Sequence, residues 1–178
     1  MSKTILILSG SPRKGGNSDY LCDKFAEGAR EAGHNVEKIF VSAKKIGYCR
    51  ACYACRETHK CILNDDMADI LDKMIRADVL VLASPVYFYS VNAQIKTVLD
   101  RTLARWTELK DKEFFYILTA GEDDRSIMAR SVECFRGFAD CFKGSREVGL
   151  VCGHGLYEKT DARTSKFADE AYAAGKNI

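Results

Sequence analysis

The sequence predicts an α/β fold, a doubly wound, five-stranded parallel sheet with strand order 2-1-3-4-5 and helices on both faces. Three observations lead to this prediction. Short apolar runs and amphipathic segments alternate five times, as strands and crossover helices do in parallel sheets. The third apolar run, Asp-Val-Leu-Val-Leu-Ala at residues 78–83, is hydrophobic almost throughout, which is typical of a strand covered on both faces. The chain has two prolines, Pro12 and Pro85, and both fall at the carboxyl ends of predicted strands.

The first half of the chain predicts three strands and two helices. Residues 3–8 form a short apolar run that ends in Gly, Ser and Pro, which indicates a buried strand. Leu, Phe and Ala recur every three or four positions over residues 19–32, and a glycine ends this helical pattern. Residues 36–41 predict the second strand. Residues 65–76 predict the second helix, because two Asp residues lead a stripe of Met, Ile and Leu. The third strand, residues 78–83, follows.

The second half repeats this alternation. Residues 93–105 and 128–142 carry apolar side chains at helical spacing, and each predicts a helix. Residues 114–119, followed by Ala-Gly, and residues 147–152, followed by Gly, are short apolar runs that predict the fourth and fifth strands. Residues 161–174 predict the final helix. Five strand–helix units in a chain of this length fit the flavodoxin-like order better than the six-strand dinucleotide-binding order.

Length and composition limit the possible functions. The 178 residues suit one domain, residues 1–178, with 47% hydrophobic and 29% charged residues. A formal net charge of +2 gives no electrostatic footprint for nucleic acid, so no nucleic-acid partner is expected. No apolar run approaches the roughly 20 residues needed to cross a bilayer, and residues 5–8 are too few for a signal-peptide core. A cytoplasmic protein without membrane contact is expected.

The loop after the first predicted strand has the composition of a phosphate-binding loop. It reads Ser-Gly-Ser-Pro-Arg-Lys-Gly-Gly-Asn-Ser and opens into a helix. Glycine lets the backbone approach a ligand closely, and a helix N-terminus presents unpaired N–H groups to an anion. The side chain of Arg13 adds a permanent charge that can bind phosphate oxygens in a fork. The alternative is a glycine-rich turn in which Asn17 or Ser18 caps the helix.

The loop after the third predicted strand, residues 84–92, places three aromatic residues in a row. A planar ligand stacked against one of them would explain this composition, and backbone N–H groups could meet carbonyl groups of its ring. The alternative is that the aromatic side chains cover the sheet edge or a subunit interface. The fourth strand is expected to end beside the third, so Thr119, Ala120 and Gly121 are expected to border the same place.

Both loops resemble those of the NADPH-dependent FMN reductase-like branch of the flavodoxin superfamily. The first shares Gly-Ser-Pro-Arg-x-Gly-Gly-Asn-Ser, and the second shares Pro-Val-Tyr-Phe-x-Ser-x-x-Ala-Gln-Ile-Lys. The resemblance extends over essentially the whole chain, because both motifs stand in the expected strand order. It implies an FMN whose phosphate is held by Ser9, Ser11, Arg13, Asn17 and Ser18. The residues that it implies around the flavin ring are Pro85, Val86, Tyr87, Phe88, Ser90 and Asn92.

A cysteine-rich loop, at roughly residues 43–64, joins the second strand to the next helix. Its cysteines, Cys49, Cys52, Cys55 and Cys61, have the spacing C-x2-C-x2-C-x5-C. Four thiolates so spaced can bind one [4Fe–4S] cluster, and tetrahedral zinc is an alternative. A labile disulfide, a patch of thiols or a loop without metal also remain open. The spacing resembles the compact motif of iron–sulfur flavoproteins, which have this fold and bind FMN and one cluster, but similar loops also occur in relatives without a cluster.

Together these features predict an FMN-dependent oxidoreductase that uses NAD(P)H. Electrons would pass from reduced nicotinamide, or from a ferredoxin-type donor, to a small acceptor. One alternative is a non-catalytic, flavodoxin-like electron carrier between proteins. Another is a cluster-free quinone, azo-dye or FMN reductase with structural or redox-sensing cysteines. The resemblance implies a homodimer or homotetramer, and no side chain stands out as a general acid or base.

Overall fold

A computed structural model describes all 178 residues and has one twisted sheet at its centre. Five strands run parallel in the order β2-β1-β3-β5-β6, and a two-residue strand, β4, pairs antiparallel with β3. The strands are β1 (Thr4–Ser9), β2 (Asn35–Phe40), β3 (Val79–Tyr87), β4 (Ser90–Val91), β5 (Glu113–Thr119) and β6 (Arg146–Gly153). All five parallel strands therefore end at one edge of the sheet.

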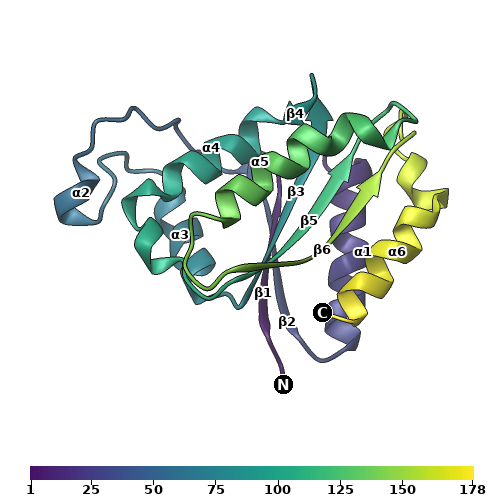
Figure 1. The fold of residues 1–178 in the computed structure, drawn as a ribbon, viewed down its shortest axis with the longest axis horizontal. Helices are drawn as coiled ribbons and strands as arrows, with labels where there is room; N and C mark the ends of the chain where they lie inside the picture. Colours follow the sequence, from purple (N-terminus) through teal and green to yellow (C-terminus); the bar gives the residue numbers. More distant parts are fainter.

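Helices cover both faces of this sheet (Figure 1). One face carries α1 (Asn17–Glu31) and α6 (Lys166–Lys176). The other face carries α3 (Met67–Arg76), α4 (Ala93–Arg101) and α5 (Ala129–Ala139). The short helix α2 (Cys55–Thr58) lies in the cysteine loop, which extends away from the sheet beyond α4 (Figure 1). None of the helices has the length and apolar character that crossing a membrane requires.

Two hydrophobic cores lie on the two faces of the sheet. Along β1, Leu6 and Leu8 point to the core beneath α3, α4 and α5, whereas Ile5 and Ile7 point to the core beneath α1 and α6. This division follows from the two-residue period of a strand. The predicted α/β fold, with a parallel sheet and helices on both faces, is confirmed.

The structure differs from the prediction at several element ends. The third strand continues to Tyr87, and β4 returns beside it as a hairpin that no alternating pattern announced. This extra strand accounts for the different strand numbering. The helix predicted at 93–105 ends at Arg101, and short 3-10 turns follow it. The helix predicted at 128–142 spans Ala129–Ala139. It begins at Ala129 because a 3-10 turn, Arg125–Met128, precedes it.

Two glycines allow α1 and α6 to pack closely. A Cβ atom on Gly28 would lie 2.1 Å from the carbonyl oxygen of Tyr172, and one on Gly175 would lie 2.0 Å from the carbonyl oxygen of Phe25. Both obstacles are backbone atoms, which cannot turn aside as a side chain can. We therefore expect the two helices to separate if either glycine gains a side chain.

The substitution Gly175→Ala is expected to lower the free energy of unfolding by about 3 kcal/mol, since it overpacks a tight interface. Gly137→Ala is the matched control, because this helical glycine has no other group within 4 Å of the position of its Cβ. The control is expected to stabilise the protein by about 0.5–1 kcal/mol through helix propensity. Urea unfolding of both variants measures the difference, and equal effects would contradict the packing argument.

Candidate functional site

A cavity of about 420 Å³ opens at the carboxyl edge of the sheet. This volume lies within the range of roughly 300–1,000 Å³ that small-molecule sites occupy. The loops after β1, β3, β5 and β6 form its walls, so segments far apart in the sequence meet there. The residues that line it are Ser11, Arg13, Asn17, Ser18, Pro85, Val86, Tyr87, Thr119, Ala120, Gly121, Leu156, Tyr157 and Glu158.

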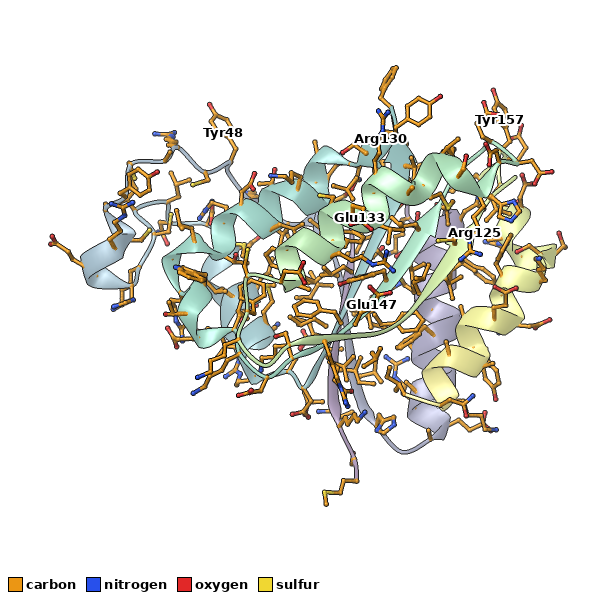
Figure 2. The ribbon with its side chains drawn as sticks, in the orientation of Figure 1. Tyr48, Arg125, Arg130, Glu133, Glu147 and Tyr157 are labelled. Carbon is orange, nitrogen blue, oxygen red and sulfur yellow. The ribbon has the colours of Figure 1, made fainter.

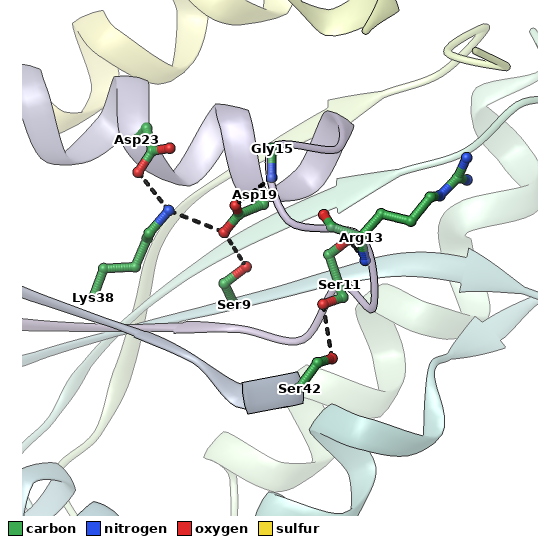
Figure 3. Close-up of polar contacts among 8 residues, drawn as sticks. All are labelled: Ser9, Ser11, Arg13, Gly15, Asp19, Asp23, Lys38 and Ser42. Atoms are coloured by element: carbon green, nitrogen blue, oxygen red, sulfur yellow. Dashed lines mark hydrogen bonds and ion pairs between the residues drawn. The ribbon is translucent and has the colours of Figure 1, made fainter. Parts of the chain in front are cut away.

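One wall of the cavity is the loop that leads into α1. Gly16 precedes the helix in an extended conformation, and no side chain caps the helix. The N–H groups of the first turn therefore lack a side-chain acceptor, and the positive end of the helix dipole lies at the cavity. The side chain of Arg13 is exposed and extends from the loop without a partner (Figure 3). This wall has the donors and the charge that bind a phosphate group.

A buried ionic network at the first turn of α1 supports the loop (Figure 3). The Asp19 carboxylate accepts hydrogen bonds from the Ser9 hydroxyl at 2.8 Å, the Gly15 N–H at 2.9 Å and the Lys38 ammonium at 2.9 Å. Burial alone would raise the pKa of Asp19, but the hydrogen bonds from Gly15, Lys38 and Ser9 outweigh it and lower the pKa. Ser9 is therefore placed beneath the loop and does not line the cavity, because its hydroxyl is used by Asp19.

The substitution Asp19→Asn is expected to lower the free energy of unfolding by about 2 kcal/mol at pH 7, because it leaves Lys38 without its buried partner. The folded pKa of Asp19 is below its unfolded value of about 3.9. The contribution of Asp19 to the free energy of unfolding is therefore complete above about pH 4, and it is lost as the pH falls through the folded pKa.

Urea unfolding at pH 7 and pH 3 measures the effect of this substitution. The control is Asp23→Asn, which removes the exposed second partner of Lys38 and should change the stability by less than about 1 kcal/mol. If Asp19→Asn lowered the free energy of unfolding equally at both pH values, the stabilising role of the ionised Asp19 carboxylate would be contradicted.

The opposite wall of the cavity comes from β3 and β5. Pro85, Val86 and Tyr87 line it at the end of β3. The Thr119 hydroxyl, at the end of β5, lies 2.7 Å from the Ser18 hydroxyl. This contact joins the wall formed by β3 and β5, the aromatic wall, to the wall formed by the loop before α1, the phosphate wall. Tyr87 gives the wall an aromatic side chain against which a planar ring can stack.

Three of the residues predicted to surround the flavin ring, Phe88, Ser90 and Asn92, do not line the cavity. The chain turns at Phe88 and Tyr89, with φ values of +48° and +63°, so the Phe88 ring projects fully into solvent. Ser90 pairs with Tyr87 in the returning strand. Asn92 is buried, where it accepts from the Ile95 N–H at the start of α4 and donates to the Gly10 carbonyl. Its role in the structure is to join the loops after β1 and β3.

The loop after β6 contributes three residues that were not among the predicted site residues. Leu156, Tyr157 and Glu158 form part of the cavity wall, and Figure 2 shows Tyr157 projecting from this loop. The Asn17 amide donates to the carbonyl oxygens of Leu156 at 3.0 Å and Glu158 at 2.7 Å, and its oxygen accepts from the Ala162 N–H. Asn17 thus holds this loop against the phosphate wall. The position of the loop at the carboxyl edge was the signal that could have identified it.

The cysteine loop forms a second, smaller hollow. Cys49, Cys52, Cys55 and Cys61 all line it, together with Arg101 and mostly apolar groups. No three cysteine, histidine or acidic side chains of the structure are placed to hold a single metal ion, as a tetrahedral zinc site requires. A four-iron cluster is wider than one ion, and it needs four cysteines around one space. The four cysteines of this loop, which are the donor set that such a cluster uses, all border the one hollow.

The base of the cysteine loop is closed by hydrogen bonds between its two ends. The Lys45 N–H donates to the Asp66 carboxylate at 2.7 Å, and the Asp66 N–H donates to the Lys45 carbonyl at 3.0 Å. The Gly47 N–H donates to the Asp65 carboxylate at 2.9 Å. The Asp65 carboxylate in turn pairs with Arg101 of α4. The loop is therefore anchored to the domain, although it extends away from it.

The two sites are distinct. No residue lines both the 420 Å³ cavity and the cysteine-lined hollow. Figure 2 shows Tyr48 of the cysteine loop and Tyr157 of the cavity toward opposite ends of the long axis of the molecule. All eight cysteines are free, and Cys141, which lies outside the cysteine loop, is exposed.

Comparison with known proteins gives concordant matches. Residues 3–132 match the model of the family described as NADPH-dependent FMN reductase. The chain is 40% identical over 96 residues to an iron-sulfur flavoprotein of Methanosarcina thermophila, a match that covers 54% of this chain and 50% of the relative. It is 42% identical over 101 residues to an iron-sulfur flavoprotein of Archaeoglobus fulgidus, which covers 57% and 46%. The chain thus spans about half the length of these curated relatives.

The fold also matches solved structures. An FMN-dependent NADH-azoreductase from Bacillus anthracis, solved in complex with FMN, superposes with a TM-score of 0.73 over 98% of both chains. The two sequences are 16% identical, so this likeness concerns the fold.

Proposed function

The chain belongs to the NADPH-dependent FMN reductase family, and on that premise we propose that it binds FMN in the 420 Å³ cavity and passes electrons from NAD(P)H to a small acceptor. One observation carries this proposal. The phosphate wall and the aromatic wall, which lie about 70 residues apart in the sequence, face one space of suitable volume. A phosphorylated planar ligand such as FMN requires both walls.

The residues of the cavity have separate tasks in this proposal. Arg13, Ser11 and the first-turn N–H groups of α1 would hold the phosphate. Tyr87 would stack on the flavin ring beside Pro85 and Val86. Bound FMN can accept two electrons from a nicotinamide and release them singly or in pairs. Tyr157 lines the cavity and is 80% exposed, so it would contact a nicotinamide or an acceptor that enters from solvent.

The cysteine loop would hold one [4Fe–4S] cluster through Cys49, Cys52, Cys55 and Cys61. The shared hollow supports this assignment, and the names of the two curated relatives agree with it. The cluster would supply one-electron transfer. Free thiols throughout the chain are consistent with work in a reducing cytoplasm.

We infer that the protein forms a homodimer or homotetramer. Phe88 is fully exposed at the turn after Tyr87, beside the cavity wall. A second copy that covered this aromatic residue would also shield the flavin ring from water. Mass photometry of the FMN-loaded protein tests for dimers or tetramers.

The anaerobic reaction of the FMN-loaded protein with NADH or NADPH tests the enzymatic proposal. Rapid loss of the flavin absorption near 450 nm, on the order of one flavin per nicotinamide oxidised, is expected of a two-electron reductase. Restoration of the absorption by a quinone would identify the class of acceptor. A protein that neither nucleotide reduces, but that a reduced ferredoxin-type donor reduces readily, would instead be an electron carrier.

A further inference from the structure

We propose that Arg101 is a positioning residue for the cluster: it clamps the two ends of the cysteine loop and directs a free N–H group toward the sulfur atoms in the hollow. This inference rests on the proposed function, because it requires a cluster in the cysteine loop. It adds a role for Arg101, which lies 40 residues after the last cysteine of that loop and is the last residue of α4.

The clamp consists of charge-assisted hydrogen bonds at one buried guanidinium. The Nη1 atom of Arg101 donates to the Gly47 carbonyl at 2.6 Å and to Asp65 Oδ2 at 2.7 Å. Its Nη2 atom donates to Asp65 Oδ1 at 2.9 Å. Gly47 lies before the first cysteine of the loop and Asp65 lies after the last, so one side chain fixes both ends of the segment. The Arg101 side chain is 1% exposed, which excludes competing water.

The remaining edge of the guanidinium carries an N–H group that makes no hydrogen bond in the structure. The carboxylate of Asp65 occupies the edge formed by Nη1 and Nη2, which leaves Nε on the adjacent edge. Nε of Arg101 is buried and makes no hydrogen bond. An unsatisfied buried donor costs about 1–3 kcal/mol, and more when it is charged. This donor belongs to a side chain that lines the hollow with all four cysteines.

The charges around Arg101 agree with this geometry. Burial alone would lower the pKa of Arg101, but the Asp65 carboxylate outweighs it and raises the pKa. Cys61 lines the same hollow as the Arg101 side chain. A sulfur atom of a cluster held by Cys61 and its neighbours would be the missing acceptor of the Nε hydrogen.

This position has a consequence for electron transfer. A cluster held by four thiolates gains negative charge when it is reduced. A fixed guanidinium and an N–H···S hydrogen bond therefore stabilise the reduced form more than the oxidised form. Arg101 should raise the reduction potential of the cluster, besides holding the loop closed. A purely structural ion pair with Asp65 would leave the potential unchanged.

The test uses the full chain, purified anaerobically with FMN, in four forms: wild type, Arg101→Lys, Arg101→Gln and the control Arg105→Gln. Arg105 lies one turn further along and pairs with Asp72 and Glu108, but it does not line the cysteine hollow. Iron, sulfide and flavin contents are measured first. The midpoint potential of the assembled clusters is then determined by a redox titration followed by electron paramagnetic resonance.

We expect Arg101→Lys, which keeps the charge but loses the fork, to make reduction at least tenfold less favourable, about 59 mV for one electron. Arg101→Gln should shift the potential further and retain less iron. Arg105→Gln should match the wild type. If both Arg101 variants lose the cluster but keep normal flavin content, while Arg105→Gln keeps its cluster, the result supports the role of Arg101 in holding the two ends of the cysteine loop.

Two other results can be told apart. Arg101 variants that have full iron content and the wild-type potential would overturn the role of Arg101 and leave the cluster in place. A wild-type protein that binds FMN but no iron and sulfide would overturn the cluster itself, and the role of Arg101 with it.

Discussion

Replacement of Arg13 with alanine is expected to weaken FMN binding by about 10- to 150-fold and to leave riboflavin binding unchanged. A hydrogen bond to a charged group contributes about 1.5–3 kcal/mol, which corresponds to this range. The Arg13 side chain lines the cavity and is exposed, so its loss should not disturb the fold. Riboflavin lacks the phosphate and cannot use Arg13.

Quenching of flavin fluorescence during titration of the flavin-free protein measures both affinities. Lys14→Ala is the matched control, because Lys14 is the next residue of the same exposed loop but does not line the cavity. The control should lose less than about threefold in FMN affinity, since a distant exposed charge is screened by salt. Equal losses of FMN and riboflavin affinity in Arg13→Ala would place Arg13 away from the phosphate.

Replacement of Cys52 with serine is expected to reduce the iron of the anaerobically purified protein from about four per chain to below about one. A serine hydroxyl is a poor ligand for iron compared with a thiolate, and a cluster with three cysteine ligands is prone to dissociate. Cys52 is exposed, so its replacement should leave the stability of the domain intact. FMN content should stay at the wild-type value, because no residue is shared between the hollow and the cavity.

The control for this substitution is Cys141→Ser. Cys141 is also exposed, but it lies after α5 and does not line the hollow. Iron and acid-labile sulfide assays of both variants should separate them clearly. A Cys52→Ser protein that retains four irons, or a Cys141→Ser protein that loses them, would contradict the assignment of the ligands.

Much of the fold could be predicted because local patterns determine it. The apolar run at 78–83 and the helical stripe at 65–76 both lie in the expected elements. The hairpin at Phe88 and Tyr89 could not be predicted, because its turn uses positive φ values at two aromatic residues. That conformation usually favours Gly or Asn.

The candidate site was predictable in part. The loops that follow parallel strands meet at the carboxyl edge of the sheet, so Arg13, Tyr87 and Thr119 could be predicted to lie near one another. All three line the cavity. The position of Ser9 was also available from the sequence. Because side chains alternate along a strand, Ser9 must face the same side as Ile5 and Ile7, beneath α1, where Asp19 binds it.

Other features depend on tertiary contacts that no local pattern contains. Asn17 lines the cavity where phosphate binding was predicted, and its amide also holds a loop 139 residues away in the sequence. Arg101 reads as an ordinary basic residue at the end of a helix, and its burial follows only from the position of Asp65, 36 residues before it. Charged side chains of this kind become informative only when their partners are known.

The cofactor content of the full chain, purified without oxygen and supplied with FMN, tests the two-site assignment most directly. Absorbance of the released flavin, together with iron and sulfide assays, gives the three ratios in one preparation. We predict about one FMN, four iron and four sulfide per chain, which is the content of one flavin site and one four-cysteine cluster. A folded chain that retains no flavin and takes up none from solution would contradict the assignment of the cavity.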